Sequence, residues 1–265
     1  MSAKRVLITG AASGIGAAAA EALRKKGNQV AGLDLRGEAE DIIACDVRDQ
    51  ASVDGAVAEA IERLGGLDVL INNAGVGNPQ SAGSAPDETA LSVIQVNMLG
   101  PWRVTSAALS ALRESLGRVV NVASGLAHVS APFSAAYCMS KRGLVGYSDS
   151  LRLEFGDEIT VTTVYPGYIR TPIHDAAAEQ GIGLEGAVPP EPLESAAGTL
   201  VRAALGRPAR DLATTRRGTI NYFLARRAPR RLLDTLTRLQ VRRLAKKGHF
   251  DDSELAREFG SRARA

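Results

Sequence analysis

A glycine-rich turn near the N-terminus constrains the fold of this chain more than any other stretch. Residues 4–9 form a short apolar run typical of a buried strand, and residues 10–16 (GAASGIG) follow at once. Good helix formers, mostly alanine, then continue to Lys26, and Gly27 ends the pattern. A strand, a glycine turn and a helix in this order bring backbone N–H groups to a helix N-terminus, where a pyrophosphate is favoured. The segment therefore predicts a dinucleotide site in an α/β fold.

Short apolar runs alternate with helical patterns through the following residues. Further strands are expected at 29–33, 42–44, 68–71, 117–122, 159–165 and, as a last edge strand, 211–214. The helical patterns cover 50–64, 87–114, 135–155 and 191–205. This alternation is typical of a parallel sheet with helices on both faces and right-handed crossovers. We therefore expect an α/β fold with a doubly wound parallel sheet of about seven strands.

The end of the second expected strand suggests which dinucleotide is bound. Asp34 lies 18 residues after Gly16, about the spacing at which an acidic residue accepts hydrogen bonds from the adenosine ribose of NAD. Its carboxylate would repel the 2′-phosphate of NADP. Arg36 lies close by and could accommodate that phosphate. We interpret Arg36 as a solvated loop charge, so NAD is the predicted cofactor and NADP the alternative.

A hydroxyl, a phenol and an ammonium follow the fifth expected strand. Ser124 comes just after the strand, and Tyr137 and Lys141 lie four residues apart at the start of the next helix. This spacing places both side chains on one helix face. An ammonium beside a phenol favours the phenolate, so we expect the pKa of Tyr137 to fall from about 10 toward working pH. Tyr137 would then act as an acid or base, and Ser124 would hydrogen-bond to the same substrate oxygen.

The chain resembles the short-chain dehydrogenase/reductases over residues 4–205. The motifs that carry the resemblance follow the family's order: the glycine turn from Thr9 to Gly16, Asp46-Val47, Asn72-Asn73-Ala74-Gly75, Asn97, Ser124, Tyr137, Lys141, Pro166-Gly167 and Thr171. Ser124 and Tyr137 also have the family's thirteen-residue separation. The resemblance implies a Rossmann-like three-layer sandwich. Residues 1–205, including a substrate loop at 173–190, would form the NAD(P)-binding catalytic domain.

The resemblance also implies which residues contact ligands. Cofactor contacts are implied for Gly10, Ser13, Gly14, Ile15, Gly16, Asp34, Asp46, Val47, Asn73, Ala74, Gly75, Tyr137, Lys141, Pro166, Gly167, Ile169 and Thr171. Substrate contacts are implied for Ser124, Leu126, Tyr137 and Tyr168. Leu126 and His128 are bulkier than the family's usual residues after the catalytic serine. Substrate contact and simple packing are both open interpretations for His128, as they are for His174.

Four residues are expected to act on the substrate. Tyr137 would move a proton to or from the substrate oxygen, and Lys141 would lower the tyrosine pKa and hold the nicotinamide ribose. Ser124 would position the substrate oxygen. Asn97 lies inside the 87–114 helical pattern, although asparagine is a poor helix-interior residue. The resemblance implies that Asn97 holds a water in a proton relay from Lys141.

Together these patterns predict an oxidoreductase that transfers a hydride between NAD(H) and a secondary alcohol or ketone, which could be lipophilic. One alternative is an NADP-dependent ketoreductase acting on acyl or lipophilic substrates. An alternative of another class is a non-catalytic dinucleotide-sensing or protein-binding module. The resemblance implies a homodimer or homotetramer formed through the long helices around Asn97 and Tyr137.

Residues 206–265 form a basic, mainly helical extension of the same domain. They hold 16 of the 32 Lys and Arg residues but 6 of the 29 Asp and Glu, so the extension carries a net charge of +10 and residues 1–205 carry −7. Leucines recur among arginines at near-helical spacing between 229 and 247. Packing on the domain or on a neighbouring subunit is the interpretation we favour. Peripheral contact with anionic lipid is an alternative, and nucleic acid is not an expected partner because no known motif occurs.

The remaining composition suggests a reduced cytoplasmic protein. Cys45 and Cys138 are far apart and have no metal or redox spacing. No apolar run approaches the roughly 18–20 residues that a membrane span needs, and the first apolar run is too short for a signal peptide. The three histidines do not suggest a metal site.

Overall fold

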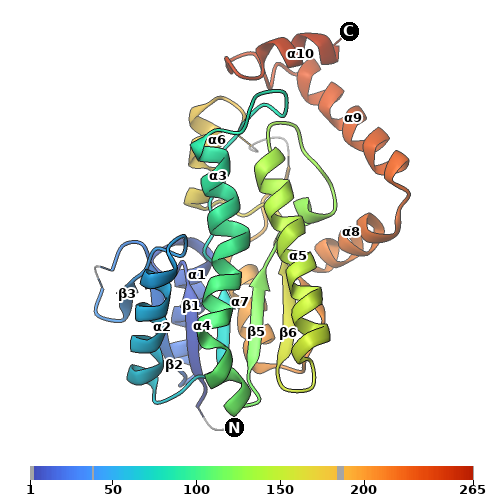
Figure 1. Cartoon of the computed structure of the whole chain (residues 1–265). Coiled ribbons are helices and arrows are strands. Elements are labelled where there is room, and N and C mark those ends of the chain that lie inside the picture. The colour runs from blue at the N-terminus through green and yellow to red at the C-terminus, as the bar shows by residue number, and fades with distance from the viewer. Residues whose placement is uncertain (1–2, 38, 184–187, 265) are drawn as a thin grey trace.

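The chain folds around a parallel β-sheet in the computed structural model, which describes residues 3–37, 39–183 and 188–264 (Figure 1). The strands are β1 (Arg5–Thr9), β2 (Gln29–Asp34), β3 (Ile42–Ala44), β4 (Val69–Asn72), β5 (Arg118–Val122), β6 (Thr160–Tyr165) and β7 (Asp211–Ala213). Their spatial order is β3-β2-β1-β4-β5-β6-β7, and each neighbouring pair is parallel. This architecture confirms the predicted doubly wound sheet. The strand order reverses between β1 and β4, where open α/β sheets bind ligands.

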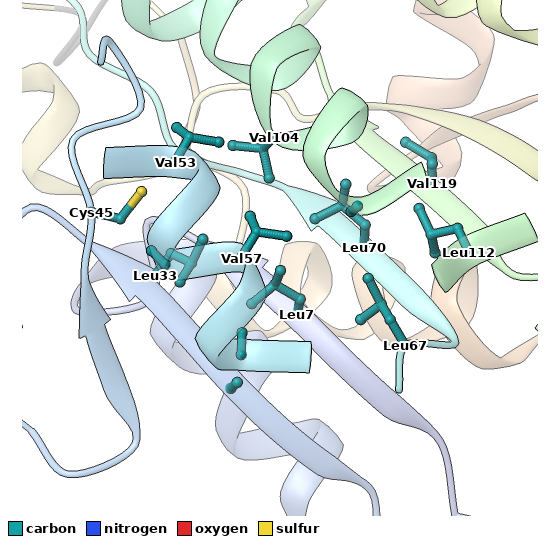
Figure 2. Close-up of a cluster of buried hydrophobic side chains, with 14 of the residues drawn as sticks. Leu7, Leu33, Cys45, Val53, Val57, Leu67, Leu70, Val104, Leu112 and Val119 are labelled. Atoms are coloured by element: carbon teal, nitrogen blue, oxygen red, sulfur yellow. The ribbon is translucent and has the colours of Figure 1, made fainter. Parts of the chain in front are cut away.

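Helices cover both faces of the sheet. On one face lie α2 (Gln50–Leu64), α4 (Gly100–Glu114) and α5 (Ala135–Phe155), and on the other α1 (Gly14–Lys25) and α7 (Leu193–Leu205). The alternation of side chains along β1 shows how one strand serves both layers. Leu7 packs into the first layer, whereas Val6 and Ile8 pack into the second. Figure 2 shows the first core, in which Leu7 and Leu70 from the sheet meet side chains from α2 and α4.

Local sequence explains where several helices start and stop. The side chain of Asp49 accepts a hydrogen bond from the N–H of Ser52 and caps α2, which ends at Gly65 in the left-handed region, with φ of +68°. Asp87 caps the next helix through the N–H of Ala90 at 2.8 Å. These two aspartates therefore mark where α2 and α3 begin.

The single long helix expected at 87–114 is wrong in detail. The segment consists of α3 (Glu88–Ile94), a π-helical turn (Gln95–Leu99) and α4. The turn contains Asn97, which is completely buried. A π-helical turn inserts an extra residue into the helix and occurs frequently at functional sites.

The loop expected at 173–190 also contains regular structure. A 3₁₀ turn (Pro172–His174) and the short helix α6 (Asp175–Glu179) lie within its first part. Residues 184–187, which fall inside the predicted substrate loop, are outside the described residues.

The C-terminal extension forms α8 (Arg216–Arg227), α9 (Arg230–Lys246) and α10 (Arg257–Arg264) after strand β7. In Figure 1, α9 runs along the periphery and leads to α10 above the carboxyl ends of the strands. The favoured interpretation, that α9 packs on the domain or on a neighbouring subunit, is supported for part of the helix and stays a prediction for its exposed leucines. Leu244 packs against the buried Ala245 and Phe250, whereas Leu236 is exposed. Among the described residues, no helix is long and apolar enough to cross a membrane.

Candidate active site

The glycine turn lies between the carboxyl end of β1 and the N-terminus of α1. A Cβ on Gly16 would overlap the carbonyl oxygen of Gly10 and lie 2.5 Å from Nδ2 of Asn73. Gly10 has a φ of +67°, and a Cβ there would lie 2.8 Å from Cα of Ala74. The first helical hydrogen bond runs from the N–H of Ala17 to the oxygen of Ser13, so the N–H groups before it have no helical partner. This backbone cradle fits a pyrophosphate.

Asp34 lies beside this turn, at the end of β2. One carboxylate oxygen accepts from the N–H of Ala12 at 3.0 Å, and the other accepts from the N–H of Arg36 at 3.3 Å. The neighbouring turn and loop thus hold the carboxylate next to the glycines. The side chain of Arg36 is exposed. Asp34, which would favour NAD, and Arg36, which could accommodate the 2′-phosphate of NADP, therefore lie at the same edge of the sheet.

Asn73 ties the end of β4 to the glycine turn. Its side-chain amide donates to the oxygens of Thr9 and Gly10 at 3.0 and 3.2 Å. The hydroxyl of Thr9 in turn accepts from the N–H groups of Asn73 and Ala74. This network fixes the switch point between β1 and β4, and Gly75 continues from it toward Asn97 and Lys141.

Two further predicted cofactor residues, Asp46 and Val47, follow β3. The Asp46 carboxylate accepts hydrogen bonds from the guanidinium of Arg48 at 2.7–3.1 Å, and this pairing lowers its pKa. Val47 is buried, and its side chain would lie 3.0 Å from a Cβ on Gly100. Val47 therefore packs against the start of α4.

The segment after β6 closes the other side of the glycine turn. A Cβ on Gly14 would lie 3.3 Å from the methyl group of Thr171. The oxygen of Pro166 accepts from the N–H of Gly125 at 3.3 Å, which joins this segment to the loop that carries Ser124. Ile169 is buried beneath it. Gly14 and Thr171, two predicted cofactor residues far apart in the sequence, therefore lie close together.

Ser124, Tyr137 and Lys141 come together at the carboxyl end of β5. Ser124 hydrogen-bonds with the phenol of Tyr137, and its Oγ accepts from the N–H of Leu126 at 3.2 Å. Lys141 is almost completely buried, and its Nζ donates to the oxygen of Val122 at 2.9 Å. The same Nζ lies 5.7 Å from the centroid of the Tyr137 ring. The helix spacing inferred from the sequence therefore does bring the phenol and the amine to one side of α5.

The expected fall of the tyrosine pKa is wrong for the chain by itself. Burial raises the pKa of Tyr137 to about 12, and the hydrogen bond with Ser124 opposes this only in part. Burial also lowers the pKa of Lys141 to about 8. The ammonium donates to the Val122 oxygen and lies near the ring, and the cost of burying a charge outweighs its pull on the phenol. Both groups are therefore driven toward their neutral forms.

Asn97 uses its side chain to hold the loop after β4. Its amide accepts from the N–H of Val76 and donates to the oxygen of Val76, both at 2.9 Å, and donates to Ser140 at 3.2 Å. A Cβ on Gly75 would lie 3.3 Å from Oδ1 of Asn97 and 3.6 Å from Nζ of Lys141. Asn97 and Lys141 therefore approach Gly75 from the same side, and both side-chain groups of Asn97 have hydrogen-bond partners within the protein. The proposed water relay remains a prediction.

The residues flanking the predicted substrate site differ in their surroundings. Tyr168 is buried, and its ring meets His174 edge-on with 4.9 Å between centroids. Leu126 is half-buried next to Ser124. His128 packs against the rings of Tyr165 and Tyr222, at 5.2 and 5.1 Å, and burial lowers its imidazole pKa. Packing is therefore the better interpretation of His128.

Glu191 was missed in the sequence, although it joins the cofactor side to the extension. Its carboxylate accepts from the N–H of Gly167 at 3.2 Å and from the hydroxyls of Thr214 and Thr215, the latter at 2.7 Å. It thus links the turn after β6 to the residues that precede α8. No local sequence signal could reveal this link, since an acidic residue before a helix is commonplace.

Three phenylalanines missed in the sequence form a cluster near the start of α5. Phe133 has a left-handed φ of +58°, and its oxygen accepts from the N–H of Gln80 at 2.9 Å. Its ring lies 5.2 Å from that of Phe259 and 6.5 Å from that of Phe250. A Cβ on Gly181 would lie 3.1 Å from the backbone of Asp252. The C-terminal residues therefore pack on loops that precede Tyr137 and follow Thr171.

Comparisons with known proteins agree with this geometry. A family model described as short chain dehydrogenase matches residues 4–182. A putative ketoacyl reductase of Streptomyces coelicolor is 38% identical over 191 residues, which cover 65% of this chain and 73% of the relative. D-threitol dehydrogenase of Mycolicibacterium smegmatis is 35% identical over 184 residues, covering 63% and 71%. The solved structure of Thermoplasma acidophilum aldohexose dehydrogenase has a TM-score of 0.73 and 26% identity, covering 80% of this chain and 92% of that one.

Proposed function

Because the chain belongs to the short-chain dehydrogenase family, we propose that it transfers a hydride between NAD(H) and a secondary alcohol or ketone. The observation that carries the proposal is the hydrogen-bonded pair of Ser124 and Tyr137, with Lys141 one helical turn further on. The pair stands at the same sheet edge as the glycine turn. A substrate oxygen within reach of both hydroxyls would therefore lie near the expected nicotinamide position.

The glycine turn, Asp34 and the turn after β6 would hold the cofactor. When bound, the nicotinamide supplies the hydride chemistry. Tyr137 moves the proton at the substrate oxygen, Ser124 orients that oxygen, and Lys141 lies near the Tyr137 ring. A neutral phenol can donate a proton to a carbonyl oxygen, and its phenolate can accept one from an alcohol, so Tyr137 can serve either direction of the reaction.

Purified protein with NADH and a panel of ketones tests the proposal. Tyr137→Phe should remove nearly all turnover, whereas NADH should still bind through the glycine turn and Asp34, because only the phenolic hydroxyl is lost. Normal turnover in this variant would show that another group handles the proton. Tight NADH binding without turnover on a broad panel would instead favour the non-catalytic dinucleotide-sensing alternative.

An NADP-dependent ketoreductase is the second candidate. Arg36 lies two residues from Asp34, and some relatives are named as putative ketoacyl reductases. We favour NAD because Asp34 is held at the glycine turn by the N–H of Ala12. Separate titrations with NADH and NADPH decide between them. Asp34→Ala should improve NADPH binding relative to NADH, whereas tighter NADPH binding by the unaltered protein would favour the second candidate.

The proposed assembly is a homo-oligomer formed through α4 and α5. A groove between these helices is lined by residues such as Met98, Leu109 and Tyr147. Trp102 and Leu153 are 56% and 89% exposed on the same helices. Light scattering would measure the mass, and a monomer would refute this assembly. A cytoplasmic location also remains a proposal, supported by buried thiols at both cysteines.

A further inference from the structure

The outward face of α9 carries large apolar side chains that remain about half exposed among the described residues. Leu232, Leu236 and Leu239 are 49%, 54% and 47% exposed. Their spacing of four and three residues places them on one stripe of the helix. The helix is anchored by a different face, where Val241 and Leu244 pack around Ala245 and Phe250. The exposed stripe is therefore not needed to attach α9 to the protein.

The preceding helix repeats the pattern. On α8, Ile220, Phe223 and Leu224 are 61%, 51% and 63% exposed. Their spacing also places them on one helix face. The guanidinium of Arg227 lies 4.2 Å from the Phe223 ring centroid, so a cation accompanies this apolar face as well. Two consecutive helices thus expose apolar side chains beside arginines. We call these six residues and the basic residues of α8 and α9 the basic–apolar surface.

The charge of this surface is strongly one-sided. Residues 216–247 contain eleven Lys and Arg residues and one acidic residue, Asp234. Within the described parts of the chain, Arg226 pairs with Asp211, whereas Arg231, Arg238, Arg242 and Arg243 have no ion-pair partner. Positive charge beside exposed apolar side chains is the pattern of helices that lie in the interface of an anionic bilayer.

A second copy of the chain matches this surface less well. A symmetric contact between two such surfaces would bring two strongly positive segments together. A contact with the acidic body of another copy would meet some carboxylates that are already paired with local arginines. Asp68 is already bonded to Arg5, and Glu158 to Arg113. An anionic lipid surface offers both the charge and the apolar phase without such competition.

We propose that α8 and α9 bind the surface of an anionic phospholipid bilayer through the basic–apolar surface. The leucine stripe would enter the boundary between head groups and acyl chains, and the arginines would contact phosphates. The contact is peripheral, with both helices lying along the lipid surface. It does not depend on the catalytic activity proposed above, because it involves none of the residues of the cofactor or substrate sites.

Co-sedimentation of the full-length protein with phosphatidylcholine vesicles, with and without phosphatidylglycerol, tests the proposal. We expect binding at least about tenfold tighter to the anionic vesicles, weakening as salt is raised. Replacing Leu232, Leu236 and Leu239 together with serine should weaken that binding about tenfold or more. Leu91→Ser on α3 is the matched control, because Leu91 is 53% exposed and lies outside the surface.

A second variant guards against misfolding of the first. Arg238→Gln combined with Arg242→Gln keeps every apolar side chain and should weaken anionic binding with a shallower salt dependence. Equal binding to both kinds of vesicle, or unchanged binding by either variant, would overturn the proposal. So would a dimer that the leucine replacements split into monomers without affecting vesicle binding, since the stripe would then join two copies.

Discussion

Replacing Lys141 with methionine should stabilise the protein at neutral pH while removing its activity. Burial lowers the pKa of Lys141 from 10.5 to about 8. A shift of this size costs the folded state about 3 kcal/mol when the amine is protonated. Methionine removes that cost but leaves the oxygen of Val122 without its donor, which costs about 1–2 kcal/mol. The variant should therefore be about 1–2 kcal/mol more stable at pH 7.

The pH dependence gives the decisive measurement. Between pH 8 and 10.5 the unfolded chain holds a proton on Lys141 that the folded chain lacks, so the stability contributed by this group rises with pH. The free-energy cost of burying the protonated amine is fully present below pH 8 and falls as the pH rises. The higher stability of Lys141→Met should therefore disappear by about pH 10. Comparing the two proteins cancels contributions from other groups with raised pKa values, such as Tyr137 and Cys45.

Urea denaturation of both proteins from pH 7 to 10, followed by circular dichroism, measures the difference. Lys26→Met, a replacement of an exposed lysine at the end of α1, is the control and should show no such trend. A Lys141→Met protein less stable than the original at pH 7 would refute the reasoning. A stability difference that does not change with pH would refute it as well, because it would mean that burial does not shift this amine.

Three further variants test other contacts. Gly16→Val should abolish NADH binding measured by fluorescence, because its Cβ overlaps the Gly10 oxygen; retained binding would place the cofactor elsewhere. Glu191→Ala should reduce turnover while leaving circular dichroism unchanged, because the turn that follows β6 loses an anchor; full activity would contradict this. Phe259→Ala should lower the free energy of unfolding by about 2 kcal/mol, because the ring is half-buried against Phe133; an unchanged urea midpoint would contradict this.

Local patterns were enough to predict the sheet and the glycine turn. Buried parallel strands are visible in the sequence as short apolar runs, and helical patterns alternate with these runs along the chain. The π-helical turn was not predictable in this way. A π-helical turn has only one residue more than an α-helical turn, so the two have similar sequence patterns. In addition, the side chain of Asn97 makes hydrogen bonds with the backbone of Val76, which is far away in the sequence. The unusual asparagine indicated a special position but not its geometry.

The pKa values of the site residues could not be predicted from the sequence. The sequence shows that Lys141 lies one helical turn from Tyr137, and it therefore predicts that the ammonium stabilises the phenolate and lowers the pKa of the phenol. It does not reveal how deeply each group is buried. For Tyr137 and Lys141 burial is the larger effect, and it moves both pKa values in the direction opposite to the one expected from their proximity.

The extension is integrated into the protein at both ends, and this determines how its role can be tested. Its beginning is held by Glu191 through Thr214 and Thr215. Its end is held by Phe250 and Phe259 against Phe133, four residues before Tyr137. Deleting the extension would therefore disturb the turn after β6 and the start of α5, together with the basic–apolar surface. Loss of both lipid binding and turnover in a truncated protein would not separate these effects. Replacements confined to the exposed leucine stripe of α9 can separate lipid binding from turnover, because those side chains lie on the helix face opposite the one that anchors α9.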